Sequence, residues 1–196
     1  MNRSHFWHAL THSLSVVFFL FPVWTGIDKN GNVSLQETPH KVVYVIAWSP
    51  DGSMIAVGNG SDPCGPSEIQ ILDAQTQAVI NTLPGGGCLW YSFDWSPDGT
   101  KIAVTTLGDI GIRVWDVKTG QLAMAGQGPT QGYVYVKWHP DGEKIVVTDI
   151  GGGAYILDSA TGELLNALNF TGSGIDWSPD GNRLVTASGI LQENKV

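Results

Sequence analysis

Cysteine and basic residues are both scarce in this 196-residue chain. Its two cysteines are too few for a disulfide-stapled fold, and neither lies in a Cys-x-x-Cys or histidine-rich arrangement that would bind zinc. Ten lysines and arginines stand against eighteen acidic residues, which gives a formal net charge of −8 at pH 7. Such a charge repels a nucleic-acid backbone or an anionic membrane surface. We therefore expect no structural metal, no cofactor and no nucleic-acid partner.

The sequence also lacks helical periodicity beyond its N-terminal segment. After residue 26 no stretch repeats apolar residues at the helical spacing of about 3.6, and short β-rich runs alternate with turn residues instead. The 25 glycines suit a protein with many turns, and the 42% hydrophobic content is enough for a sizeable core. These features predict an all-β fold.

Long apolar runs are confined to the N-terminal segment. Residues 1–13 contain one arginine, three histidines and no acidic residue, and residues 14–23 form an apolar run. This pattern is typical of a signal peptide, although no good small-x-small cleavage site follows it. We expect residues 1–26 to be a signal peptide or N-terminal anchor, so that the protein is periplasmic, secreted or membrane-anchored and meets a membrane only through this segment. A buried strand and a misassigned start codon are the alternatives.

A five-residue motif, Trp-Ser-Pro-Asp-Gly, occurs four times, with histidine in place of serine in the third copy. Proline presets one backbone angle of a turn, aspartate bonds to its own backbone and glycine accepts a positive φ, so Pro-Asp-Gly reverses an extended chain. The spacing of the copies is close to the ~40–45 residues of one four-stranded propeller blade. The motif residues expected to anchor the repeat are Trp48, Asp51, Gly52, Trp95, Asp98, Gly99, Trp138, Asp141, Gly142, Trp177, Asp180 and Gly181.

A second turn, which begins with aspartate, recurs in the first three repeats. It spans residues 73–77, 116–120 and 158–162. The leading aspartate can accept backbone N–H bonds across such a turn. In the second repeat Trp115 precedes this aspartate, and we expect Trp115 and Asp116 to be further structural anchors.

The repeats define the expected domains. We expect residues 27–40 to be a linker with a possible extra strand at 33–36, and residues 41–196 to be an incomplete propeller. Its blades are expected at about 41–84, 85–126 and 127–169, with a partial blade at 170–196. The fold class is then a β-propeller segment of about three and a half four-stranded blades in an open arc, preceded by the apolar segment. The tryptophans expected to be buried between blades are Trp48, Trp95, Trp138 and Trp177.

The second repeat carries Trp95-Ser96-Pro97-Asp98-Gly99 and, further on, Ile112-Arg113-Val114-Trp115-Asp116. This pair of motifs resembles the WD-repeat β-propeller family, and the resemblance covers about residues 40–190. The turns also resemble those of related bacterial propellers. Other repeats depart from the family, since Leu72-Asp73 and Leu157-Asp158 stand where it has Trp-Asp. The resemblance implies a propeller that acts as a platform for a protein or peptide partner.

Catalytic signatures are missing from the sequence. It has no Gly-x-Ser-x-Gly elbow, no phosphate-cradling loop and no His-Glu-x-x-His metal site. After residue 26 the only histidines are His40 and His139, and we expect His139 to be an exposed turn residue. A non-enzymatic interaction module is therefore expected. The alternatives are a propeller portion of a larger exported enzyme or transporter accessory protein, and a fragment without a function of its own.

Two aromatic residues are candidates for the partner surface. Trp90 and Tyr133 each lie five residues before an anchor tryptophan, near the start of an innermost strand. Large aromatic side chains there can anchor an interface, and the alternative is that they wedge between blades.

The sequence leaves open whether the two cysteines form a disulfide and how the incomplete fourth repeat is covered. Cys64 and Cys88 fall in loops that share one face of a propeller, so a disulfide and two free thiols are both open. Only residues 190–196 remain for the outer strands of the fourth repeat. A strand edge and a blade face should then stay exposed, and self-association or missing blades would be needed to close the propeller.

Overall fold

The computed structural model describes residues 25–27, 33–35, 41–61, 67–84, 89–107, 111–126, 132–168, 174–186 and 189–192. All regular secondary structure within these ranges is β-strand, as the turn pattern predicts. The chain divides into two compact units, Met1–Thr38 and Pro39–Val196. In the first unit, β1 (Thr25–Ile27) pairs antiparallel with β2 (Val33–Leu35).

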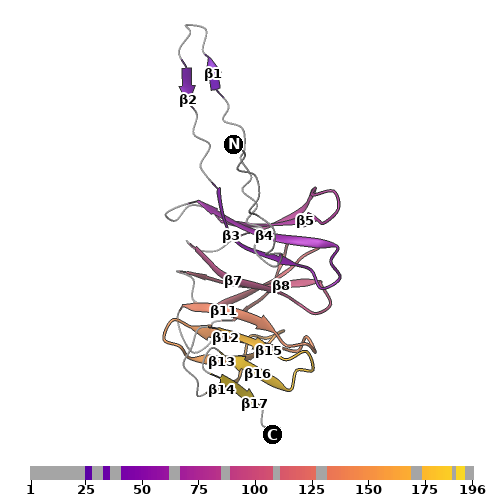
Figure 1. Cartoon of the computed structure of the whole chain (residues 1–196), viewed down its shortest axis with the longest axis vertical. Helices are drawn as coiled ribbons and strands as arrows, with labels where there is room; N and C mark the ends of the chain where they lie inside the picture. The colour runs from indigo at the N-terminus through magenta and orange to yellow at the C-terminus, as the bar shows by residue number, and fades with distance from the viewer. Residues whose placement is uncertain are drawn as a thin grey trace, which may run out of the picture. The chain divides into compact units, whose positions relative to one another are not determined.

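The second unit consists of four antiparallel sheets, which we call blades 1 to 4 in chain order (Figure 1). Blade 1 contains β3 (Lys41–Trp48), β4 (Met54–Ser61), β5 (Glu68–Asp73) and β6 (Val79–Pro84). Blade 2 contains β7 (Leu89–Trp95), β8 (Lys101–Leu107), β9 (Ile112–Asp116) and β10 (Leu122–Gly126). Blade 3 contains β11 (Tyr133–Trp138), β12 (Lys144–Asp149), β13 (Ala154–Asp158) and β14 (Leu164–Leu168). Blade 4 contains β15 (Ile175–Trp177), β16 (Arg183–Thr186) and β17 (Gly189–Gln192).

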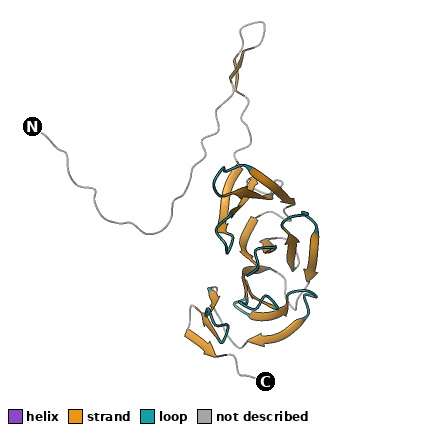
Figure 2. Ribbon diagram, turned by 90° about the vertical axis from the view of Figure 1, so that its right-hand side faces the viewer, coloured by secondary structure: helices purple, strands orange, loops and turns teal. Residues whose placement is uncertain are grey.

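The blades of the second unit follow one another along an open arc (Figure 2). Within each blade the strands pair in sequence order, so every blade is a simple meander. The prediction of an all-β open propeller segment is therefore confirmed. The apolar run at 14–23 lies outside the described residues.

The first strand of each four-stranded blade has an irregular register near its start. The shifts fall between Val43 and Val45 in β3, between Trp90 and Ser92 in β7, and between Tyr133 and Tyr135 in β11. An extra residue of this kind bends a strand and increases its local twist. Because the shift recurs at one repeat position, it is part of the repeated unit.

The hydrophobic core lies between the blades, in three clusters. Each cluster combines one face of a blade with the opposite face of the next, so that Ile69 and Ile71 of blade 1 pack with Trp95 and Ile102 of blade 2. Blades 2 and 3 share a second cluster and blades 3 and 4 a third. Each blade therefore depends on its neighbours for burial, as in other repeat proteins.

The anchor tryptophans do not all share one environment. Trp95, Trp138 and Trp177 are buried, with 5%, 7% and 7% of their surface exposed, as expected. For Trp48 the prediction is wrong, because it is 61% exposed. Each buried tryptophan packs against the blade before its own, and among the described blades of the second unit none precedes blade 1.

Candidate functional site

The Trp-Ser-Pro-Asp-Gly turns use their aspartates internally. In blade 1, Asp51 Oδ1 accepts hydrogen bonds from Ser49 Oγ at 2.7 Å and from the Ser53 N–H at 3.0 Å. Gly52 closes the turn with a φ of 71°, in the left-handed region that favours glycine. The Ser49 hydroxyl, followed by Ser53, lowers the pKa of Asp51 to about 2. This carboxylate is therefore ionised and committed to the turn.

The second and fourth copies of the turn repeat this arrangement. Ser96 Oγ donates to Asp98 Oδ1 at 2.5 Å, and Ser178 Oγ donates to Asp180 Oδ1 at 2.5 Å. These hydroxyls are the main cause of a lowered pKa in both carboxyls, and for Asp180 the pKa falls to about 2. A group that stays ionised and bonded in this way is a poor general acid or base near pH 7. These recurring aspartates therefore stabilise their turns.

The second turn also occupies its aspartate. Asp116 Oδ1 accepts hydrogen bonds from the Thr119 N–H at 2.7 Å and from Thr119 Oγ1 at 2.8 Å, and these bonds lower the pKa of Asp116. Asp73 and Asp158 make the same pair of bonds to the threonine three residues on. Trp115, which precedes Asp116, packs half-buried against the cluster between blades 1 and 2.

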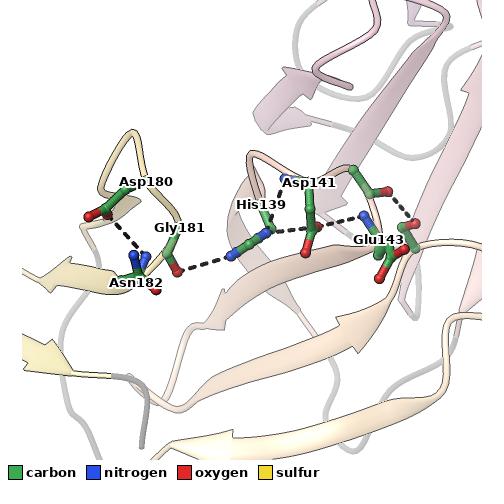
Figure 3. A network of polar contacts seen from close by, with 8 residues as sticks. His139, Asp141, Glu143, Asp180, Gly181 and Asn182 are labelled. Carbon is green, nitrogen blue, oxygen red and sulfur yellow. Dashed lines mark hydrogen bonds and ion pairs between the residues drawn. The ribbon is translucent and has the colours of Figure 1, made fainter. Parts of the chain in front are cut away.

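His139 gives the third copy of the turn a different role. The prediction of an exposed turn residue is wrong, because His139 is buried and its ring lies edge-on to Trp177, with 4.5 Å between ring centroids. Its Nε2 is 3.0 Å from the backbone oxygen of Gly181, and its Nδ1 is 2.7 Å from Asp141 Oδ1 (Figure 3). Imidazole is longer than the serine side chain, so it spans from blade 3 to the next turn. Nε2 makes the contact with the next turn, while Nδ1 faces Asp141 in the turn of His139 itself.

A row of charges on the first strands of blades 2 to 4 was missed by the sequence reasoning. Asp94, Lys137 and Asp176 each directly precede an anchor tryptophan. Asp94 Oδ1 lies 3.5 Å from Lys137 Nζ, and Asp94 Oδ2 accepts the Trp138 N–H at 2.8 Å. Burial raises the pKa of the Asp94 carboxyl, against the opposing charge of Lys137. The sequence does contain a signal for this row, because the residue before the anchor tryptophan is charged in three of the four repeats.

The structure corrects the expected partner surface at Tyr133. This residue is fully buried in the cluster between blades 2 and 3, where its ring meets Tyr155 edge-on at 6.3 Å. It therefore wedges between blades, which was the alternative. The side chain of Trp90 lies outside the described residues.

An aliphatic residue is exposed beside the buried Tyr133. Ile150, at the turn between β12 and β13, is 70% exposed, and its N–H donates to the Gly132 oxygen at 3.1 Å, directly before β11. The preceding residue, Asp149, accepts the Gly153 N–H at 2.8 Å and lies 3.2 Å from the Tyr155 hydroxyl. These bonds hold the turn in one conformation, with the Ile150 side chain in solvent.

Other expected features fall largely outside the described residues. Cys64 and Cys88 are among these, so their pairing stays a prediction. Within the part of the chain that is described, no three His, Cys, Asp or Glu residues come together as a metal site would require. The same described part contains no helix with the length and apolar character needed to cross a membrane.

Comparison with known proteins places the chain in a family. A family model described as "Eukaryotic translation initiation factor eIF2A" matches residues 11–150. Among solved structures, the chain is similar to the C-terminal WD40 domain of Sif2, with a TM-score of 0.63 and 22% identity over 75% of this chain. It spans 40% of the length of that domain, and at this identity the likeness concerns the fold alone. No curated protein matches the chain.

Propellers of this kind generally mediate contacts between proteins and are typically non-catalytic scaffolds. The family match covers more than half of the sequence, and the repeated blades agree with it. The chain therefore belongs to the eIF2A family and has a WD-repeat β-propeller fold.

Proposed function

We propose that this chain is a non-enzymatic interaction module that binds a protein or peptide through the end of blade 3 where the β12–β13 turn exposes Ile150. The exposure of Ile150 on a fixed turn is the observation that carries the proposal. Because hydrogen bonds already hold the backbone of this turn, binding through Ile150 costs little backbone conformational entropy. Such residues can act as anchors at the centre of an interface.

The aspartates of the described residues are engaged in structural hydrogen bonds, which supports a binding role over catalysis. The repeated aspartates are bonded within their turns, and Asp94 is bonded to the next blade. The net charge of −8 favours a partner segment with basic residues around an apolar anchor. We therefore expect a peptide or protein surface that combines an apolar side chain with lysine or arginine.

A binding experiment tests this surface directly. Peptides selected from a random display library against the full chain should include apolar residues flanked by basic ones. Ile150→Asp should weaken the selected peptides roughly tenfold or more. Leu165→Asp is the matched control, since Leu165 is also an exposed aliphatic residue of blade 3. Equal affinity for wild type and Ile150→Asp would show that the partner surface lies elsewhere.

The location of the chain is a separate part of the proposal. The apolar run at 14–23 supports export, so we propose a periplasmic, secreted or membrane-anchored protein. The matching family is named for translation initiation, and a role of that kind would require the cytoplasm. Cell fractionation of the tagged full chain decides between the two. A purely cytoplasmic protein would contradict export.

A larger assembly remains the second candidate. This candidate is a propeller portion of a larger protein, such as an exported enzyme or a transporter accessory protein; the chain spans 40% of the length of the similar WD40 domain. An activity that requires a covalently joined second domain would support this candidate over a free-standing interaction module.

A further inference from the structure

The side of blade 1 that faces away from blade 2 carries apolar residues that the repeat normally buries. In blades 2, 3 and 4, the anchor tryptophan and the residue two positions before it are buried against the preceding blade; these pairs are Phe93 with Trp95, Val136 with Trp138, and Ile175 with Trp177. In blade 1 the same positions hold Ile46, which is 58% exposed, and Trp48. This face has the composition of a blade interface, but no described blade of the second unit packs against it.

The side of blade 4 that faces away from blade 3 shows the complementary exposure. Eight residues after each anchor tryptophan stands a small or branched aliphatic residue on the side that the following blade covers. Ala56, Ala103 and Val146 hold this position in blades 1 to 3, and all are fully buried. Val185 holds it in blade 4 and is 49% exposed. Blade 4 therefore presents the surface on which an anchor tryptophan packs.

The Trp-Ser-Pro-Asp-Gly turns also pack against the turn of the preceding blade, except in blade 1. A β-carbon placed on Gly99 would lie 3.7 Å from Pro50 of the preceding turn, and one on Gly142 would lie 3.9 Å from Pro97. A β-carbon on Gly52 would meet nothing within 4 Å. The turn of blade 1 thus has room for the turn of a preceding blade.

The residues of a polar contact between blades 2 and 3 also have counterparts in blades 4 and 1. Between blades 2 and 3, Asp94 accepts the backbone N–H of Trp138. Asp176 occupies the position of Asp94 in blade 4 and is exposed, with its Oδ1 bonded to the Trp177 N–H at 2.9 Å. Trp48 occupies the position of Trp138 in blade 1. An Asp176 carboxylate could therefore accept the Trp48 N–H of another molecule without a new type of contact.

We propose that these two faces pack together between copies of this chain, so that blade 4 of one copy covers blade 1 of the next. The partner is a second copy because the three interfaces within the chain already show how these two kinds of face fit. The contact is heterologous, so it forms a closed ring if its rotation closes and an open filament if it does not. Two copies would contribute eight blades, within the four to eight that typically close a propeller. Ile150 takes no part in this proposed contact.

Electrostatics makes the proposed association dependent on salt. Each copy has a net charge of −8, so two copies repel each other at long range. Dissolved salt screens that repulsion, with a Debye length of about 10 Å at 0.1 M. The apolar contact between Trp48 and Val185 is not weakened by salt. Association should therefore strengthen as the salt concentration rises.

The mass of the full chain, measured by sedimentation between about 1 and 100 μM, tests the proposal. Wild type should form dimers or larger species, and Trp48→Glu and Val185→Glu should each weaken association at least about tenfold. Ile80→Glu is the control, because Ile80 is an exposed aliphatic residue on the outer strand of blade 1. This variant should associate like wild type. Circular dichroism of each variant establishes that it is folded.

Mixing the two interface variants distinguishes the proposed geometry from others. Trp48→Glu retains an intact blade 4 face and Val185→Glu retains an intact blade 1 face, so an equimolar mixture should recover a dimer. A monomeric wild type over the whole concentration range would overturn the proposal. It would also be overturned if Val185→Glu associated normally, since Trp48 faces would then pair with each other, or if the mixture stayed monomeric.

Discussion

His139 Nε2 lies 3.0 Å from the backbone oxygen of Gly181, so one side chain joins the turn of blade 3 to the turn of blade 4. The other copies of the turn have serine at this position, and serine bonds within its own turn. His139 also keeps a contact with the aspartate of its own turn, Asp141, so this single substitution in the repeat adds a contact between blades.

His139→Ala should lower the free energy of unfolding by about 1–3 kcal/mol, because it leaves the buried Gly181 oxygen without this partner and removes the ring from Trp177. His139→Ser should cost less, since serine can keep a bond to Asp141 as it does in the other copies. Urea unfolding of the three proteins measures the difference. If His139→Ser were the more damaging change, the interpretation of the turn would be wrong.

Trp95→Ala should destabilise the protein by about 3–5 kcal/mol, the usual cost of emptying a buried aromatic site. Trp48→Ala removes the same side chain from the same repeat position, but its site is exposed, so the expected change is within about 0.5 kcal/mol. Thermal or urea unfolding at a concentration too low for association provides the comparison. Similar losses for both variants would contradict the burial difference.

The sequence was sufficient to predict the repeated blades because the turn chemistry is local. Pro-Asp-Gly and the second aspartate turn determine where the chain reverses, and the spacing between them determines the strands. Burial of a repeat residue depends on its neighbours as well. Trp48 begins the same Trp-Ser-Pro-Asp-Gly motif as Trp95 but has no described blade against it, so the motif alone predicted the wrong environment.

The candidate site was harder to predict than the fold. Tyr133 is aromatic and lies near a loop, which suggested exposure, but the register shift at the start of β11 and the contact with Tyr155 belong to the tertiary structure. Ile150 gave no signal as a single aliphatic residue beside glycines. Its exposure results from the turn that Asp149 and Gly132 hold.

Lys137→Ala should destabilise the protein by about 0.5–1 kcal/mol at neutral pH, because it leaves the partly buried Asp94 carboxylate without its opposing charge. Burial already raises the pKa of Asp94, and the loss of Lys137 raises it further. The penalty should therefore shrink as the pH falls and Asp94 becomes protonated. Unfolding measurements near pH 7 and pH 4 give the two values, and Asp94→Asn with Lys137→Ala completes the double-mutant cycle. A penalty that does not change with pH would mean that the charge of Asp94 is not its cause.

Acidification should destabilise the protein through its turns. The pKa values of Asp51 and Asp180 are lowered to about 2 in the folded chain, against about 3.9 in an unfolded one. The unfolded state therefore binds more protons, and the stability that these groups supply is present above pH ~4 and lost as the pH falls toward 2. Asp51→Asn and Asp180→Asn should make the loss of stability between pH 5 and about 2 shallower in urea unfolding. Asp94→Asn is the control with the opposite sign, because the pKa of Asp94 is raised and its removal should make that loss steeper. If all three variants followed the wild-type pH profile, the turn aspartates would not be the source of acid sensitivity.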